Sequence, residues 1–135
     1  MKTLIGIALV GLFFLPIARA DDPTSPKLPT VDTSLHKMII DTFGKDAPKM
    51  EAIIACESSG VQTTNNIPLL SKTNDTGLTQ INISNWKKAV ELGLDIWFSP
   101  LDNLKFAKYI LDTQGFSAWT TYKTPCYYRN LVKDS

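Results

Sequence analysis

The sequence predicts a small, mostly α-helical domain of the α+β kind, with a short irregular or hairpin segment between its helices. Apolar residues recur at helical spacing before position 57 and after position 84. The stretch from Gly60 to Asn82 has no helical period and is rich in Thr, Asn, Ser and Gly, which favours turns. The length of 135 residues, with 44% hydrophobic and 20% charged, fits one globular domain.

The first twenty residues have the pattern of a secretory signal peptide. A lysine at position 2 is followed by an almost wholly apolar run, and residues 18–20 read Ala-Arg-Ala, which suits a cleavage site. The apolar run is short for a membrane span of ~20 residues; an uncleaved N-terminal anchor is the alternative. Residues 21–32 hold three prolines and are predicted to be a linker, which leaves 33–135 as the domain.

The first predicted helix runs from Ser34 to Phe43, and Gly44 is expected to end it. A second helix follows, which Asp46 is expected to cap and which has Pro48 in its first turn. Glu57 then falls at the C-terminal end of the second helix, on its apolar side.

Two further helices are expected after the irregular segment. Ser84 is expected to cap a helix that runs through Leu92 and stops at Gly93. Pro100 opens another helix, and Gly115 follows its end. The apolar positions of this helix are expected to face inward: Leu101, Leu104, Ala107, Ile110 and Leu111.

A last short helix is expected after Gly115, capped by Ser117 and holding Trp119 and Tyr122. The aromatic side chains of Trp86, Trp97 and Phe98 are interpreted as packing residues rather than as platforms for sugars.

Charge and composition exclude several kinds of site. The 14 basic and 13 acidic residues give a net charge of +1, which is no basic footprint for nucleic acid. Loss of the leader removes Lys2 and Arg19 and leaves 12 bases against 13 acids. No glycine-rich phosphate-binding motif is present, and one His with two Cys cannot by themselves build a four-ligand zinc site.

The predicted export to an oxidising compartment favours a disulfide between the two cysteines. In an oxidising compartment, Cys56 and Cys126 most simply form one disulfide, which would close a loop of about 70 residues. Two buried free thiols are the alternative.

Glu57 and Asp75 are the candidate catalytic residues. Burial at the end of an apolar helix would raise the pKa of the Glu57 carboxyl, which is what a general acid needs. Asp75 lies in a polar turn, where it is expected to stay ionised. Two carboxyls in unlike environments form an arrangement that cleaves glycosidic bonds without a metal or an organic cofactor.

Three motifs resemble those of the lysozyme-like superfamily, and they occur in the family's order. The first is a Glu-Ser pair that ends a helix. The second resembles the cleft strand of animal (c-type) lysozymes and the Gly-Leu-Met-Gln motif of bacterial lytic transglycosylases of the SLT type. The third resembles the Gly-x-x-Ala-Trp…Cys segment of c-type lysozymes. Their residues are Cys56-Glu57-Ser58-Ser59-Gly60, Asn74-Asp75-Thr76-Gly77-Leu78-Thr79-Gln80-Ile81-Asn82, and Gly115-Phe116-Ser117-Ala118-Trp119 with Tyr122 and Cys126.

The resemblance implies roles for individual residues. Glu57 matches the general acid, and Asp75 matches the second carboxylate, which stabilises or captures the oxocarbenium-like centre. Trp119 matches a tryptophan that gives the acid an apolar wall. The resemblance also implies that five matched residues bind substrate: Ser58, Gln80, Asn82, Trp119 and Tyr122. Ser58 would support either the helix end or the substrate.

These observations predict an exported or cell-envelope enzyme that cleaves peptidoglycan at the β-1,4 bond from N-acetylmuramic acid to N-acetylglucosamine, with Glu57 as general acid. Two alternatives stay open: a lytic transglycosylase that uses Glu57 alone and leaves a 1,6-anhydro end, and a non-catalytic glycan-binding module. The adjacent position of Cys56, unlike that in c-type lysozymes, makes the disulfide an inference from the sequence itself. We expect a monomer with glycan strands as its partner, and no integral membrane partner.

Overall fold

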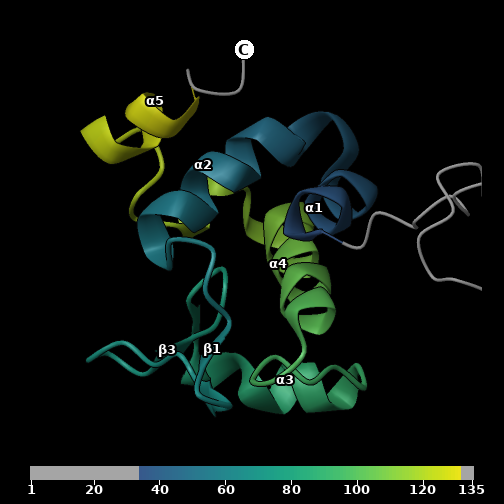
Figure 1. Cartoon of the computed structure of the whole chain (residues 1–135). Coiled ribbons are helices and arrows are strands. Elements are labelled where there is room, and N and C mark those ends of the chain that lie inside the picture. Colours follow the sequence, from purple (N-terminus) through teal and green to yellow (C-terminus); the bar gives the residue numbers. More distant parts are fainter. Residues whose placement is uncertain (1–33, 132–135) are drawn as a thin grey trace, which may run out of the picture. The chain divides into compact units, whose positions relative to one another are not determined.

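The computed structural model describes residues 34–131, so the predicted signal peptide and linker lie outside the described residues. Five α-helices and two short hairpins make up this part of the chain (Figure 1). The helices are α1 Leu35–Phe43, α2 Ala47–Glu57, α3 Trp86–Glu91, α4 Pro100–Gln114 and α5 Pro125–Leu131. The strands are β1 Thr63–Thr64, β2 Ile67–Pro68, β3 Asp75–Thr76 and β4 Ile81–Asn82. The prediction of a mostly helical lysozyme-like α+β domain is confirmed.

Helices α1 and α2 begin and end close to the predicted positions. The Ser34 side chain accepts a hydrogen bond from the backbone N–H of Lys37, which satisfies one free donor at the start of α1. The predicted cap at Asp46 is wrong. Its backbone is already helical, because the 3-10 turn Gly44–Asp46 continues directly into α2, and its side chain makes no capping hydrogen bond.

The irregular segment contains two antiparallel hairpins. In the first, Thr64 pairs with Ile67, and the left-handed backbone of Asn65 and Asn66 makes the turn between them. In the second, Asp75 pairs with Asn82 and Thr76 pairs with Ile81. This register places the predicted second carboxylate beside an amide side chain across the hairpin.

Helix α3 starts differently from the prediction. The side chain of Asn82, not that of Ser84, accepts the capping hydrogen bond, from the Ser84 backbone N–H at 3.0 Å. Ser84 itself lies inside the 3-10 turn Ile83–Asn85 that precedes α3. Asn82 is thus both a strand residue and the cap of this 3-10 turn, whereas Asn85, the residue before α3, makes no side-chain capping hydrogen bond.

The predicted last helix is also wrong in position. Residues 116–118 form only a 3-10 turn, the Ser117 hydroxyl donates to the Gln114 carbonyl, and the helix begins at Pro125 instead. Trp119 is drawn inward by a hydrogen bond from its indole Nε1 to the Thr79 carbonyl, at 2.9 Å. That tertiary contact holds the segment as a turn.

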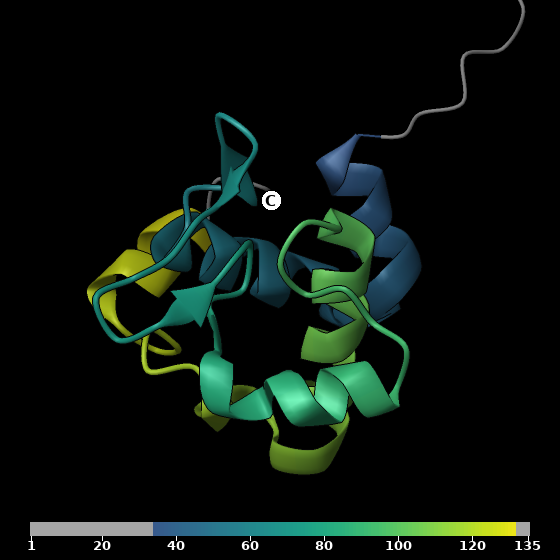
Figure 2. The same ribbon diagram turned by 90° about the horizontal axis from the view of Figure 1, so that it is seen from below.

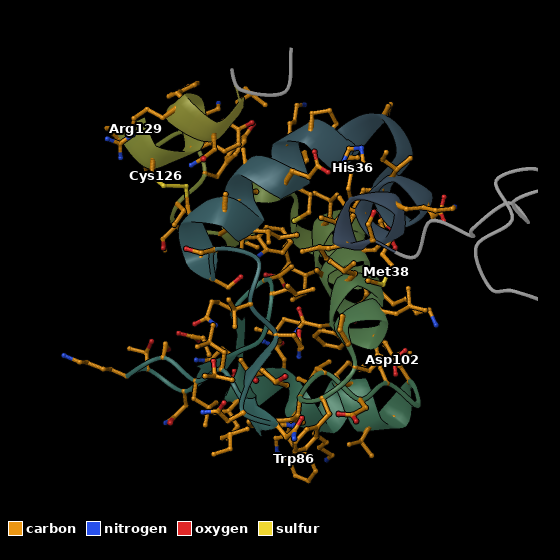
Figure 3. All side chains as sticks on the ribbon, viewed as in Figure 1. His36, Met38, Trp86, Asp102, Cys126 and Arg129 are labelled. Atoms are coloured by element: carbon orange, nitrogen blue, oxygen red, sulfur yellow. A yellow bond between two sulfur atoms is a disulfide. The ribbon has the colours of Figure 1, made fainter. Side chains whose placement is uncertain are left out.

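The core lies where α4 meets α1 and α2, with the hairpins and α5 on the opposite side from α1 (Figure 2). Of the predicted inward positions of α4, Leu104, Ala107 and Ile110 are buried and Leu111 is half-buried, but Leu101 is exposed. Of the three aromatic residues interpreted as core or surface packing, Trp97 packs against the core, while Trp86 and Phe98 lie at the surface. Figure 3 shows Trp86 at the outer edge of the domain.

Candidate active site

Glu57 and Asp75 line one cavity between the end of α2 and the second hairpin. Helix α4 and the turn that follows it close the other side. The lining is largely polar, and it contains both candidate carboxyls together with four side-chain amides. The lining residues are Glu57, Asp75, Gln80, Ile81, Asn82, Asn85, Ile110, Gln114, Ala118, Trp119 and Thr120.

The Glu57 carboxyl has a pKa above its ordinary value. Burial is the main cause, because removal from water disfavours the charged form, and the negative charge of Asp75 acts in the same direction. Hydrogen bonds from Thr121 oppose this effect without cancelling it. A carboxyl of this kind holds its proton at a higher pH than an exposed glutamate does, as a general acid requires.

Asp75 is shifted in the opposite direction. Burial on its own would raise the pKa of this carboxyl, but hydrogen bonds from Thr73, Asn82 and Ser71 outweigh burial and lower it. Asn82 Nδ2 donates to Oδ1 at 2.8 Å, Ser71 donates to Oδ2 at 2.8 Å, and the Thr73 hydroxyl also donates to Oδ2. Both oxygens are therefore engaged, and Asp75 is held ionised in a fixed orientation.

The turn between β3 and β4 is held by side chains from other elements. Gln62 accepts from the Leu78 backbone N–H at 3.0 Å, and its amide donates to the carbonyls of Ile96 and Trp97. Buried Asn103 of α4 accepts from the Thr79 backbone N–H and hydroxyl. These bonds fix the backbone that carries Gln80 into the cavity.

Gly77 is required where this turn meets Gln62 and Asn103. Its backbone is left-handed, with φ of 72°, and a Cβ at this position would lie 2.4 Å from Asn103 Nδ2 and 2.5 Å from Gln62 Oε1. No other residue offers both the conformation and the space.

Three of the predicted substrate-binding residues line the cavity, namely Gln80, Asn82 and Trp119. Ser58 and Tyr122 are not among the lining residues. The Ser58 hydroxyl donates to the Leu78 carbonyl at 2.7 Å, so it ties the end of α2 to the turn. The Tyr122 ring stacks on Phe116 and meets Tyr127 edge-on.

Cys56 and Cys126 form a disulfide, as the sequence predicted, and Figure 3 shows Cys126 at the start of α5. The bond attaches α5 to α2 one residue before Glu57. Between Trp119 and Cys126, the hydroxyl of Thr121 donates to Glu57 Oε1 at 2.8 Å.

Sequence reasoning missed several residues that build this site. Asn103 had a readable signal, because it is a polar residue four positions before Ala107 on the inward face of α4. Thr121 lies within the Trp119–Cys126 segment but carries no motif of its own. Asn85, Gln114 and Gln62 carried no signal that would separate them from surface residues.

The described residues offer neither a cluster of metal ligands nor a membrane-spanning helix. Within residues 34–131, no group of three or more His, Cys, Asp or Glu side chains lies together as metal ligands would. None of the helices formed by these residues is both long and apolar enough to span a membrane.

A helix-end glutamate and a hairpin aspartate that share one polar cavity have the arrangement expected of a lysozyme-like domain. The chain belongs to the family of the transglycosylase SLT domain, whose family model matches residues 34–118. Neither curated proteins nor solved structures gave a match. Family membership makes the chain an enzyme of the lytic transglycosylase and lysozyme type, and it supports cleavage of peptidoglycan in the cell envelope.

Proposed function

We propose that the chain cleaves the β-1,4 bond from N-acetylmuramic acid to N-acetylglucosamine without water, with Glu57 as the one proton donor and acceptor. The observation that carries this proposal is the position of Glu57, a half-buried carboxyl of raised pKa inside a cavity lined by amides. The family match adds support for a transglycosylase type of reaction.

The reaction proceeds in two steps. Glu57 gives its proton to the bridging oxygen, the bond from that oxygen to C1 of the muramic acid breaks, and N-acetylglucosamine leaves with a free hydroxyl. The 6-hydroxyl of the same muramic acid then attacks C1 and returns its proton to the Glu57 carboxylate. The products are a 1,6-anhydro ring and a regenerated acid, and no water is consumed.

Asp75 is proposed to stabilise positive charge at C1 rather than to attack it. It stays ionised, and hydrogen bonds to both of its oxygens hold it in place and reduce its nucleophilicity. Preorganised negative charge near a developing oxocarbenium ion is an effective form of stabilisation.

The remaining cavity residues are proposed to bind the glycan. Gln80, Asn85 and Gln114 can hydrogen-bond N-acetyl and hydroxyl groups. Asn82 instead holds Asp75 and the 3-10 turn before α3. The Trp119 indole N–H is occupied by Thr79, so its ring contributes an apolar wall beside Glu57. The predicted roles of Ser58 and Tyr122 in binding substrate stay predictions. An exported monomer with a cleaved leader remains part of this proposal.

Hydrolysis is the second candidate, and the ionised Asp75 in the same cavity favours it. A water molecule that attacks C1 in place of the 6-hydroxyl would leave a reducing end. A non-catalytic glycan-binding module would have no use for a carboxyl of raised pKa.

Mass spectrometry of digested peptidoglycan tests the proposal. The protein is expected to release muropeptides lighter by one water than the hydrolysed forms, and Glu57→Gln is expected to release none. Glu91→Gln is the matched control, because Glu91 is an exposed glutamate on α3 that pairs with Lys88. Full activity of Glu57→Gln would contradict the assignment, and reducing-end products would favour hydrolysis.

A further inference from the structure

The segment between Trp119 and Cys126 is fixed at both ends, and one of its residues, Thr121, contacts Glu57. Trp119 is tied to the Thr79 carbonyl at one end, and the disulfide ties Cys126 to Cys56 at the other. Inside the segment, the hydroxyl of Thr124 donates to the Thr121 carbonyl at 2.6 Å. Thr121 is therefore held in a rigid turn, half-buried, with its own hydroxyl 2.8 Å from Glu57 Oε1.

We propose that Thr121 is a positioning residue for Glu57: its hydroxyl donates to Oε1 and fixes the rotation of the carboxyl. This inference rests on the proposed role of Glu57 as the proton donor. It assigns a role to a residue beyond the stretch that the family model matches, which ends at residue 118.

The need for such a residue follows from the chemistry of a glutamate side chain. The terminal torsion of a glutamate is broad, so a carboxyl without a partner samples many orientations. Among residues 34–131, Thr121 is the one residue that donates a hydrogen bond to the Glu57 side chain. The backbone N–H of Thr121 also acts on this carboxyl, so the hydroxyl and the backbone of one residue together limit its rotation.

Thr121 also lowers the pKa of the Glu57 carboxyl. Burial raises the pKa of Glu57, and the Thr121 hydrogen bond lowers it by favouring the charged form. The hydroxyl therefore helps Glu57 to release its proton as the bond breaks, and to remain a carboxylate until the 6-hydroxyl returns it. Loss of the hydroxyl should slow the chemical step and leave substrate binding nearly unchanged.

The disulfide holds the segments that carry Glu57 and Thr121 next to each other. Cys56 immediately precedes Glu57 on α2, and Cys126 follows Thr121 by five positions, at the start of α5. One covalent bond thus joins the two segments that carry the hydrogen-bonded pair.

The test compares Thr121→Val, which removes the hydroxyl at nearly constant volume, with Thr121→Ser, which restores it. Thr42→Val is the matched control, since the Thr42 hydroxyl is half-buried on α1 and bonds only the Met38 carbonyl among the described residues. Each variant is measured for kcat and KM on peptidoglycan, for the pH dependence of kcat, and for the pKa of Glu57 by NMR titration of its labelled carboxyl carbon. Thermal unfolding reports on stability.

Thr121→Val is expected to lower kcat about tenfold, since a hydrogen bond to a charged group is lost. Its KM should stay close to that of the unmodified protein. Its pH profile and the NMR pKa of Glu57 should both move upward. Thr121→Ser should recover kcat and both pKa readouts, and Thr42→Val should change none of them.

Two results would overturn the inference. One is an unchanged Glu57 pKa and kcat in Thr121→Val. The other is a loss of kcat that Thr121→Ser shares and that follows the loss of stability. The titration does not depend on turnover, so it separates this inference from the proposed function: an inactive protein, or an active Glu57→Gln variant, would reject the proposed function on separate data.

Discussion

Gly77→Ala tests whether the turn that carries Gln80 into the cavity depends on close contact with Gln62 and Asn103. The new Cβ would lie 2.4 Å from Asn103 Nδ2 and 2.5 Å from Gln62 Oε1. Both amides are buried and hydrogen-bonded, so neither can move without breaking its bonds. The substitution should therefore displace the turn as well as strain it.

The magnitude has two parts. A left-handed backbone costs alanine about 1–2 kcal/mol relative to glycine. Overpacking against a filled interior adds about 1–3 kcal/mol. Gly93→Ala isolates the first part, because Gly93 has a similar φ of 69° and nothing within 4 Å of the Cβ position.

The assay is urea unfolding followed by tryptophan fluorescence, together with the rate of peptidoglycan cleavage. Gly93→Ala is expected to lose about 1–2 kcal/mol of unfolding free energy and to keep its activity. Gly77→Ala should lose about 1–3 kcal/mol more than this control and most of its activity. Equal losses in the two variants would refute the argument that Gln62 and Asn103 make Gly77 necessary.

Three further predictions concern charge and covalent structure. Cys126→Ser should lower the unfolding free energy by about 4 kcal/mol in the chain-entropy model. Urea unfolding of the variant and of the unmodified protein measures this difference, and an unchanged midpoint would contradict the prediction. Because burial raises the folded-state pKa of Glu57, the stability of the fold should decrease as pH rises from the ordinary pKa of 4.5 through the raised one. Glu57→Gln should therefore have a higher Tm than the unmodified protein at neutral pH. An equal or lower Tm would contradict the prediction that the ionised Glu57 destabilises the fold. Asn82→Ala should raise the pKa of Asp75, read by NMR titration, since one of its three hydrogen bonds is lost; a constant pKa would exclude that role.

Local sequence signals placed most of the helices correctly. Ser34 and Gly44 bound α1 as expected, and Pro100 and Gly115 bound α4, because caps and breakers act through the backbone close to them. Ser84 failed as a cap because Asn82, two positions earlier, is an equally good acceptor already held by the hairpin. Such competition between neighbours is decided by tertiary contacts.

The two candidate carboxyls were identified from sequence, but their environments were only partly predicted. A polar setting for Asp75 could be read from its neighbours, and Thr73 and Ser71 do hold it. The hydrogen-bond donor to Glu57 could not be predicted from the sequence, since Thr121 is 64 positions away and contacts Glu57 only in the folded, disulfide-linked chain. The pairing of the cysteines was predictable because the chain contains two of them.

The start of the last helix could not be predicted from the local sequence pattern. Ser117 has the chemistry of a cap, yet residues 116–118 form only one turn because Trp119 is bonded to the Thr79 carbonyl. A hydrogen bond between positions 40 residues apart has no local signature. The helix starts instead at Pro125, just before Cys126.

Digestion of peptidoglycan in heavy-oxygen water tests the central claim most directly. Cleavage by Glu57 with attack from the 6-hydroxyl consumes no water, so the released muropeptides should carry a 1,6-anhydro end and no label. The same digest by Glu57→Gln should release nothing. One heavy oxygen at each new reducing end would contradict the non-hydrolytic mechanism and assign the attack on C1 to water.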